Sequence, residues 1–141
     1  MRAAVDANVL IAARLERDQH HERATVLTRA IDRAELPRTA VPGGVLEETL
    51  NYVHSRGSHP AAVATLDGLA DSVGFEITAT DSADLDRGRS VFRRYDALSL
   101  TDAVIVAWMR RVGVEYLYSF DDDFDAVDGV VRLETPHWPA S

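Results

Sequence analysis

Short apolar segments alternate with longer amphipathic segments along the whole chain, and this alternation constrains the fold more than any other feature. In the longer segments apolar residues recur at helical spacing, whereas the short ones are typical of strands. The predicted strands are 3–5, 39–41, 75–78, 116–119 and 130–133. One helix is predicted to begin at residue 9. Further helices are predicted over 20–34, 45–53, 61–71, 81–94 and 99–111. This order predicts an α/β fold in which a parallel sheet of four to five strands is sandwiched between helices.

Two of the predicted helices differ in how they should pack. In the helix over 61–71, Val63, Leu66 and Ala70 share one side, which predicts that this side faces the core. The segment 103–109 is apolar on all sides. Such a segment is typical of a helix that is packed on several sides rather than lying at the surface.

The composition excludes several classes of protein. The 141 residues suit one domain, 1–141. The chain has no cysteine, which excludes a disulfide framework, a thiolate zinc site and a cysteine nucleophile. All 15 basic residues are arginine, so P-loop, Schiff-base and general-base lysines are excluded. No apolar run approaches the ~20 residues of a membrane span and no signal peptide is evident, so we expect a cytoplasmic protein without a membrane.

The charge balance indicates the ionic strength at which the protein works. The chain has 23 acidic residues and a net charge of −8. An acidic surface without lysine is typical of a halophilic protein, which stays soluble in a high-salt cytoplasm. The negative charge does not exclude a nucleic-acid substrate, because the Debye length is only ~3 Å at 1 M salt.

Acidic residues follow the predicted elements at one edge of the sheet. Asp6 follows the first strand and Asp121 follows the fourth, and the carboxyl ends of parallel strands lie on the same edge, where ligands bind in such folds. Asp102 lies at the start of the buried helix, and Glu47 and Glu48 lie in the first turns of another helix. These separate segments therefore predict one acidic cleft.

Several carboxylates in one cleft repel one another unless some of them are protonated or a cation is bound among them. Each pair of charges at ~4 Å costs on the order of 4 kcal/mol at an effective dielectric constant of 20. Oxygen ligands without cysteine or histidine nearby suit a hard cation, Mg²⁺ or Mn²⁺. Such a centre suits phosphodiester hydrolysis, because the ion stabilises charge on the phosphate and lowers the pKa of an attacking water.

Four segments in this order resemble the motifs of PIN-domain nucleases, and in particular the VapC-like toxins of prokaryotic toxin–antitoxin pairs. The segments are Val-Asp-Ala-Asn-Val-Leu (5–10), Val-Leu-Glu-Glu-Thr-Leu (45–50), Leu-Ser-Leu-Thr-Asp-Ala (98–103) and Ser-Phe-Asp-Asp-Asp-Phe (119–124). The resemblance covers essentially the whole chain. It implies a Rossmann-like fold and cleavage of RNA with Mg²⁺ or Mn²⁺.

The resemblance also implies a set of site residues. The acids that bind the ion and catalyse the reaction are Asp6, Glu48, Asp102 and Asp121. Small polar residues that hydrogen-bond the ligands or their water are Asn8 and Ser119, and Asp123 is an accessory ligand. Glu47 remains an alternative to Glu48, because both flank the apolar stripe of their helix.

Structural roles are the alternatives at these positions. Asp6 would serve as a helix N-cap, and Ser99 with Asp102 has the spacing of a capping box, which is compatible with metal binding. Asp122, Asp125 and Asp128 are interpreted as a solvated turn.

Other polar residues are assigned no role in the site. His20 and His21 precede a helix and are interpreted as facing solvent. The doublets Arg93-Arg94 and Arg110-Arg111 are interpreted as solvated or ion-paired helix faces, with contacts to RNA phosphates as the alternative. Tyr52 is assigned either to packing or to stacking on bases.

The resulting hypothesis is a divalent-metal-dependent endoribonuclease that hydrolyses RNA phosphodiesters and is the toxin of a toxin–antitoxin pair. The implied partners are an RNA substrate, a small antitoxin protein and a second copy of the chain in a homodimer. The alternatives are a catalytically weak PIN-like module that binds RNA or protein, a housekeeping RNA-processing nuclease, and a metal-dependent phosphatase.

Overall fold

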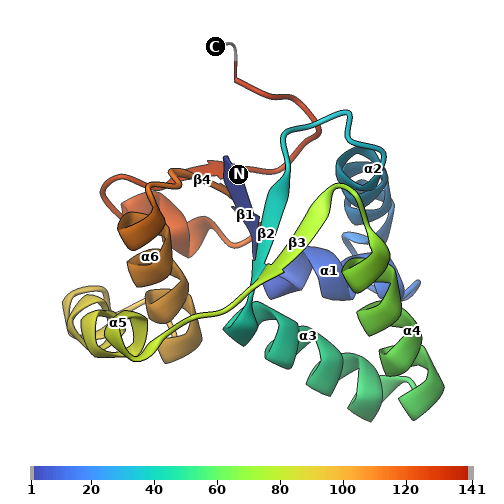
Figure 1. The fold of residues 1–141 in the computed structure, drawn as a ribbon, viewed down its shortest axis with the longest axis horizontal. Helices are drawn as coiled ribbons and strands as arrows, with labels where there is room; N and C mark the ends of the chain where they lie inside the picture. Colours follow the sequence, from blue (N-terminus) through green and yellow to red (C-terminus); the bar gives the residue numbers. More distant parts are fainter. Residues whose placement is uncertain (1, 140–141) are drawn as a thin grey trace.

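A five-stranded parallel sheet forms the centre of the protein, as a computed structural model describing residues 2–139 shows (Figure 1). The strands are β1 (Ala3–Val5), β2 (Thr39–Pro42), β3 (Phe75–Thr78), β4 (Tyr116–Tyr118) and β5 (Val131–Leu133). Their order in the sheet is β3-β2-β1-β4-β5, and every neighbouring pair is parallel. The predicted α/β fold with a parallel sheet is therefore confirmed.

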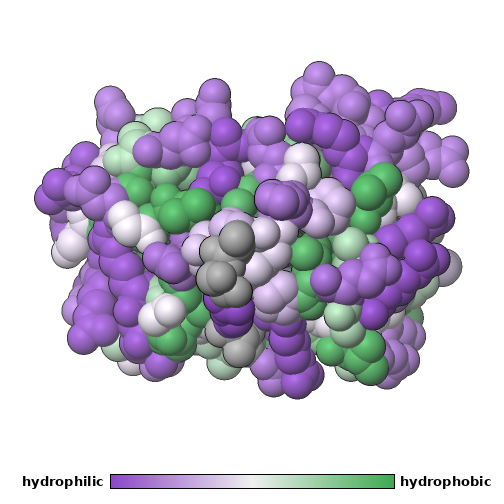
Figure 2. Space-filling model, turned by 90° about the horizontal axis from the view of Figure 1, so that it is seen from above, coloured by the Kyte–Doolittle hydropathy of each residue, from purple (hydrophilic) through white to green (hydrophobic). Residues whose placement is uncertain are grey.

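The helices cover both faces of this sheet. They are α1 (Ala7–Arg14), α2 (His21–Asp32), α3 (Gly43–Arg56), α4 (His59–Asp71), α5 (Ser82–Arg94) and α6 (Leu100–Val112), with a short 3₁₀ helix, η1 (Asp122–Ala126). Figure 1 shows α1 to α4 on one side of the sheet and α5 and α6 on the other. The surface is mostly hydrophilic in the view of Figure 2, where hydrophobic residues form separate patches.

The core is built on the central strand and on α6. All three residues of β1 are fully buried, and its two alanines allow helices to approach closely from both faces. In α6 the residues from Ile105 to Met109 are all buried, which confirms the prediction of a helix packed on several sides.

The predicted face of α4 was wrong by one residue. The buried side chains of α4 are Ala62, Thr65 and Leu69, whereas Val63 is 40% exposed. The helical period was correct but its phase was not, since the buried side is the one that carries Leu69 and the predicted side is shifted by one residue from it.

A buried ion pair joins α5 to α6. Asp84, whose side chain is fully buried, accepts hydrogen bonds from Nε (2.7 Å) and Nη2 (3.0 Å) of Arg111. The Arg111 guanidinium, through its hydrogen bonds and charge, lowers the pKa of Asp84 despite the opposing effect of burial. Asp84 also completes a capping box with Asp81 at the start of α5. The doublet 110–111 thus includes a structural ion pair.

No helix among residues 2–139 is both long and apolar enough to cross a membrane.

Gly88 allows α5 and α6 to come close together, and this contact can be tested. A Cβ atom on Gly88 would lie 2.7 Å from Cγ2 and 3.0 Å from Cα of Val104. We expect Gly88→Ala to lower the free energy of unfolding by about 1–3 kcal/mol, because the helices must separate. The matched change Gly68→Ala, in α4, would meet only the flexible end of Arg14 at 3.2 Å and should stabilise the protein by about 0.5–1 kcal/mol. Urea denaturation measures both, and a Gly88→Ala variant more stable than the parent would contradict the packing.

Candidate active site

The candidate site lies where the chain reverses its direction across the sheet. From β1 the chain proceeds to β2 on one side, and β4 is added later on the other side of β1. This is the position at which open parallel sheets form a crevice beyond their carboxyl ends. Val5 pairs with Tyr118, so the next residues, Asp6 and Ser119, leave the sheet side by side. The backbone N–H of Asp6 still donates to the carbonyl of Tyr118, at 2.9 Å.

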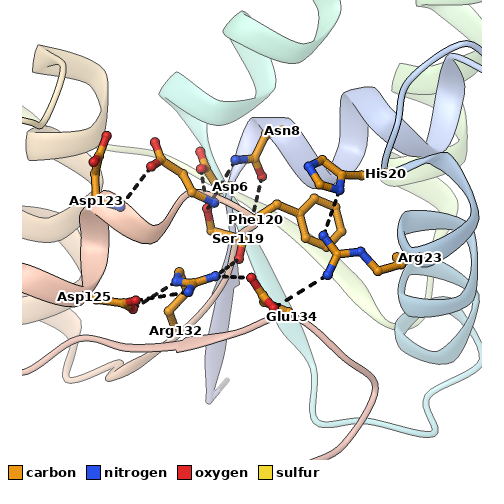
Figure 3. Close-up of polar contacts among 11 residues, drawn as sticks. Asp6, Asn8, His20, Arg23, Ser119, Phe120, Asp123, Asp125, Arg132 and Glu134 are labelled. Atoms are coloured by element: carbon orange, nitrogen blue, oxygen red, sulfur yellow. Dashed lines mark hydrogen bonds and ion pairs between the residues drawn. The ribbon is translucent and has the colours of Figure 1, made fainter.

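A hydrogen-bond network centred on Ser119 organises this crevice (Figure 3). The Ser119 hydroxyl donates to Oδ2 of Asp6 at 2.8 Å, and its oxygen accepts the backbone N–H of Asp121 at 3.0 Å. It also accepts Nδ2 of Asn8 at 3.3 Å, while Oδ1 of Asn8 accepts the backbone N–H of Phe120 at 3.3 Å. Asn8 and Ser119 therefore fix the position of two of the predicted acids relative to each other.

Asp6 is held at both of its carboxylate oxygens. Its Oδ1 accepts the backbone N–H of Ala7 at 2.8 Å, so Asp6 is the N-cap of α1. The partial positive charge of a helix N-terminus favours a carboxylate there. Capping and membership of the acidic cluster are therefore compatible roles for this residue.

Asp102 and Glu48 reach the crevice from two helices that pack against each other. Asp102 closes a capping box at the start of α6, with its backbone N–H donating to the Ser99 hydroxyl at 3.1 Å and its Oδ2 accepting from Ser99 N at 3.4 Å. Glu48 lies in α3, whose beginning contacts α6. Burial and the charge of Asp102 both raise the pKa of Glu48. Glu48 and its neighbour Glu47 are both exposed, and the charge of Asp102 acts on Glu48.

The charges of the predicted acids repel one another and raise several of their pKa values. Burial, then the charge of Asp102 and finally that of Glu48 raise the pKa of Asp6 from 3.8 to about 7, although the Ser119 hydrogen bond opposes this shift. Burial raises the pKa of Asp102, and the charges of Asp121 and Asp123 add to the effect. The charges of acids from four distant segments of the chain thus act on one another, although no three of Asp6, Glu48, Asp102 and Asp121 have carboxylate oxygens that all lie within 4.8 Å of one another.

The loop after β4 supplies a further group of acids. Oδ1 of Asp121 accepts the backbone N–H of Asp123 at 2.9 Å and begins η1. Among residues 2–139, Asp121, Asp122 and Asp123 are the one trio whose carboxylate oxygens all lie within 4.8 Å of one another. The charge of Asp121, with some burial, raises the pKa of Asp123. The sequence interpretation of Asp122 as part of a solvated turn missed this proximity, although the side chain is exposed as that interpretation expects.

Arg132 is a site-supporting residue that sequence reasoning missed. Its Nε and Nη2 bind the two oxygens of Asp125 at 2.9 and 3.0 Å, and its Nη1 donates to the carbonyl of Ser119 at 3.2 Å and to Glu134. Asp125 is therefore neutralised rather than merely solvated, and its pKa is lowered by these hydrogen bonds. A single arginine within the apolar strand β5 was the available signal, because a charge there requires a partner.

His20, the N-cap of α2, and His21, its first residue, are partly buried rather than fully solvent-facing as the sequence interpretation expected. The ring of His20 lies 4.7 Å from that of Phe120, and its Nδ1 accepts a hydrogen bond from Arg23 at 2.7 Å. The guanidinium of Arg23 lies 4.5 Å from the centre of the Phe120 ring. Nδ1 of His21 is 2.7 Å from the carbonyl oxygen of Ala12. These contacts fasten α2 to α1 and to the loop after β4.

Comparisons with known proteins were consistent with one another. The family model of the PIN domain matches residues 3–130. Ribonuclease VapC13 of Mycobacterium tuberculosis is 28% identical over 111 residues, which cover 73% of this chain and 84% of the relative. The crystal structure of VapC20 of Mycobacterium tuberculosis, described as a sarcin-ricin loop cleaving toxin, superimposes with a TM-score of 0.76 at 26% identity, covering 89% of this chain and 95% of the other. VapBC2 from Rickettsia felis, bound to a DNA fragment from its promoter, shares the fold (TM-score 0.70, 12% identity, 94% and 98% covered).

Removal of the Ser119 hydroxyl tests the central network. In Ser119→Ala, Oδ2 of Asp6 and the backbone N–H of Asp121 lose their partners, and we expect a loss of about 1–3 kcal/mol in the free energy of unfolding. Urea denaturation at neutral pH measures the loss. The control is Ser90→Ala, which changes an exposed residue of α5. Equal stabilities of the two variants would show that the network contributes nothing.

The raised pKa of Asp6 predicts how stability depends on pH without divalent ions. In the unfolded chain the group titrates near its ordinary value of 3.8, and in the folded protein it titrates at about 7. The folded state therefore binds more protons in this interval, and stability must fall as the pH rises from about 4 to about 7. At about 1.4 kcal/mol per pKa unit, the loss is a few kcal/mol.

We expect Asp6→Asn to flatten this profile, because the amide keeps hydrogen-bonding capacity but carries no charge. Denaturation in EDTA at a series of pH values measures the profile. Asp86→Asn, which changes an exposed acid of α5, is the control and should keep the slope of the parent. The assignment is wrong if Asp6→Asn also keeps it.

Proposed function

The chain belongs to the PIN-domain family, and on this premise we propose that it is a divalent-metal-dependent endoribonuclease that hydrolyses RNA phosphodiester bonds. The observation that carries the proposal is that Ser119 joins Asp6 and Asp121 by hydrogen bonds at the crevice between β1 and β4, where the charges of Asp102 and Glu48 also act on Asp6. The similarity to VapC13 and VapC20, a ribonuclease and a toxin that cleaves the sarcin-ricin loop, supports RNA as the substrate.

The chemistry of the donor set fits a hard divalent cation. The converging side chains offer carboxylate oxygens, the ligands that Mg²⁺ and Mn²⁺ prefer. The pKa values of Asp6, Glu48 and Asp102 are all raised, which is the electrostatic mark of a cluster that gains stability from a bound positive charge. We propose that these three acids and Asp121 hold Mg²⁺ or Mn²⁺, with Asp123 as an accessory ligand.

The side chains of the chain itself prepare the site for hydrolysis. A bound divalent ion supplies positive charge that stabilises the phosphate and favours deprotonation of water. Ser119 and Asn8 hold Asp6 and Asp121 in fixed positions through the hydrogen bonds described above. The capping box with Ser99 likewise fixes Asp102. A carboxylate held in this way can orient a water for attack on the phosphorus without reorganising.

We further propose that the protein is the toxin of a toxin–antitoxin pair and acts in the cytoplasm. Its similarity to VapC20, described as a toxin, supports this role. A small antitoxin protein is then its partner, and the family resemblance also implies a homodimer. Analytical ultracentrifugation of the purified chain, alone and with the product of a neighbouring short reading frame, tests both partners.

Substitution of the adjacent glutamates tests the assignment of the site. We expect Glu48→Gln to lower the rate of RNA cleavage at least 100-fold, because it removes a charge from the cluster, and Glu47→Gln to change it less than threefold. Asp6→Asn and EDTA should abolish cleavage of a labelled single-stranded RNA that the parent cuts with Mg²⁺ or Mn²⁺. Equal cleavage by the parent, by Asp6→Asn and in EDTA would exclude the proposed function. Loss of activity in Glu47→Gln but not in Glu48→Gln would assign the metal ligand to Glu47 instead of Glu48.

A further inference from the structure

A second polar groove opens where α1 ends, beside the C-terminal half of α3. Its volume is about 640 Å³. It is lined by Arg14, Leu15, Glu16, Arg17, Asp18, Tyr52 and Arg56, and it is called the α1–α3 groove below.

The charge of the α1–α3 groove differs in sign from that of the whole protein. Arg14, Arg17 and Arg56 are exposed, and none of them is among the arginines that form ion pairs within residues 2–139. Two carboxylates share the rim, and that of Asp18 accepts the backbone N–H of His20 at 2.8 Å. Three guanidinium groups thus outnumber two carboxylates in a protein whose net charge is −8. A local positive region of this kind attracts anionic groups.

A row of residues along α3 joins the acidic site to this groove. Glu48, Tyr52 and Arg56 follow one another at intervals of four residues, so they lie along the same side of the helix, about 6 Å apart at each step. Glu48 belongs to the acidic cluster, whereas Tyr52 and Arg56 line the groove. Helix α1 also extends from the acidic site to this groove, since Asp6 caps its start and Arg14 is its last residue.

Tyr52 offers an aromatic surface midway along this row. The residue is 38% exposed, and the guanidinium of Arg56 lies 5.5 Å from the centre of its ring. Exposed aromatic rings flanked by arginines are the elements with which proteins bind single-stranded nucleic acid, because bases stack on the ring while phosphates pair with the cations.

We propose that the α1–α3 groove binds the nucleotides of a single-stranded RNA that flank the bond cleaved at the acidic site. A base stacks on Tyr52, and the flanking phosphates contact Arg14, Arg17 and Arg56. This inference rests on the proposed function, because the acidic site must bind the same strand. The continuous row from Glu48 to Arg56 favours RNA over an acidic protein segment, which would need no path to the acidic cluster.

RNA affinity provides the direct test. A fluorescent single-stranded RNA is titrated, by anisotropy, against the full chain carrying Asp6→Asn, which prevents cleavage. Addition of Arg14→Gln, Arg17→Gln and Arg56→Gln should weaken binding at least tenfold. It should also reduce the slope of log K against log salt by about 2, at ~0.7 for each lost contact to a single strand. The control carries Arg29→Gln, Arg33→Gln and Arg87→Gln, which change the net charge equally at exposed positions outside the groove, and none of these arginines forms an ion pair within residues 2–139.

Tyr52 is tested by a conservative pair of variants. Tyr52→Leu removes the ring and should weaken RNA binding about tenfold, whereas Tyr52→Phe keeps the ring and should bind as the parent does. Circular dichroism confirms that each variant is folded over the salt range used. If Phe and Leu weaken binding equally, stacking on Tyr52 is excluded.

Hydrolysis of a small diester separates this inference from the proposed function. Bis(p-nitrophenyl) phosphate reaches only the acidic site, so the groove variants without Asp6→Asn should hydrolyse it at the parental rate while their KM for long RNA rises. A parent that hydrolyses neither substrate contradicts the proposed function, yet the affinity measurements still decide the role of the groove. If the variant with three groove substitutions and the variant with three control substitutions bind RNA equally, the inference is overturned. An acidic protein segment is then the remaining partner for this surface.

Discussion

The burial of one carboxylate, that of Asp6, among the charges of other acids is the interaction on which the candidate site depends. Asp6 is only 4% exposed and lies in the field of Asp102 and Glu48, so its charged form is unfavourable without a compensating cation. The protein tolerates this cost because the surroundings hold the side chain firmly. The Ser119 hydroxyl and the N-terminus of α1 bind its two oxygens, and the strands β1 and β4 position both residues.

The same elements that stabilise the fold also position the site. Asp6 is the N-cap of α1 and Asp121 that of η1, and Asp102 is the acidic member of the capping box that begins α6 at Ser99. A helix N-terminus compensates part of a carboxylate's charge and fixes its rotamer. The acidic cluster is therefore built from local structure that forms anyway, and only the repulsion between these local units is left for a bound cation to relieve. Arg132 stabilises this arrangement, because its Nη1 donates a hydrogen bond to the carbonyl of Ser119.

Much of the fold and of the candidate site could be predicted from the sequence. Strand and helix positions follow from local periodicity, and the edge occupied by Asp6 and Asp121 follows from the rule for parallel sheets. Contacts between distant segments could not be predicted in this way. Which side of α4 is buried depends on its packing against both α3 and β3, and the ring contact of His20 depends on where Phe120 projects after β4. The bidentate contact of Arg132 with Asp125 likewise requires η1 to fold back on β5.

The sequence by itself determined the element order, the absence of cysteine and lysine chemistry, and the acids that end strands or begin helices, because these depend on residue type and local spacing. Only the tertiary structure decided which acids repel one another, since the charge of Asp102 reaches Glu48 through the packing of α3 against α6. It also decided that three arginines, which form no ion pair within residues 2–139, line one groove with Tyr52. Electrostatic interactions act through space and weaken as the distance between the charges grows, so they depend on distances that the linear chain does not supply.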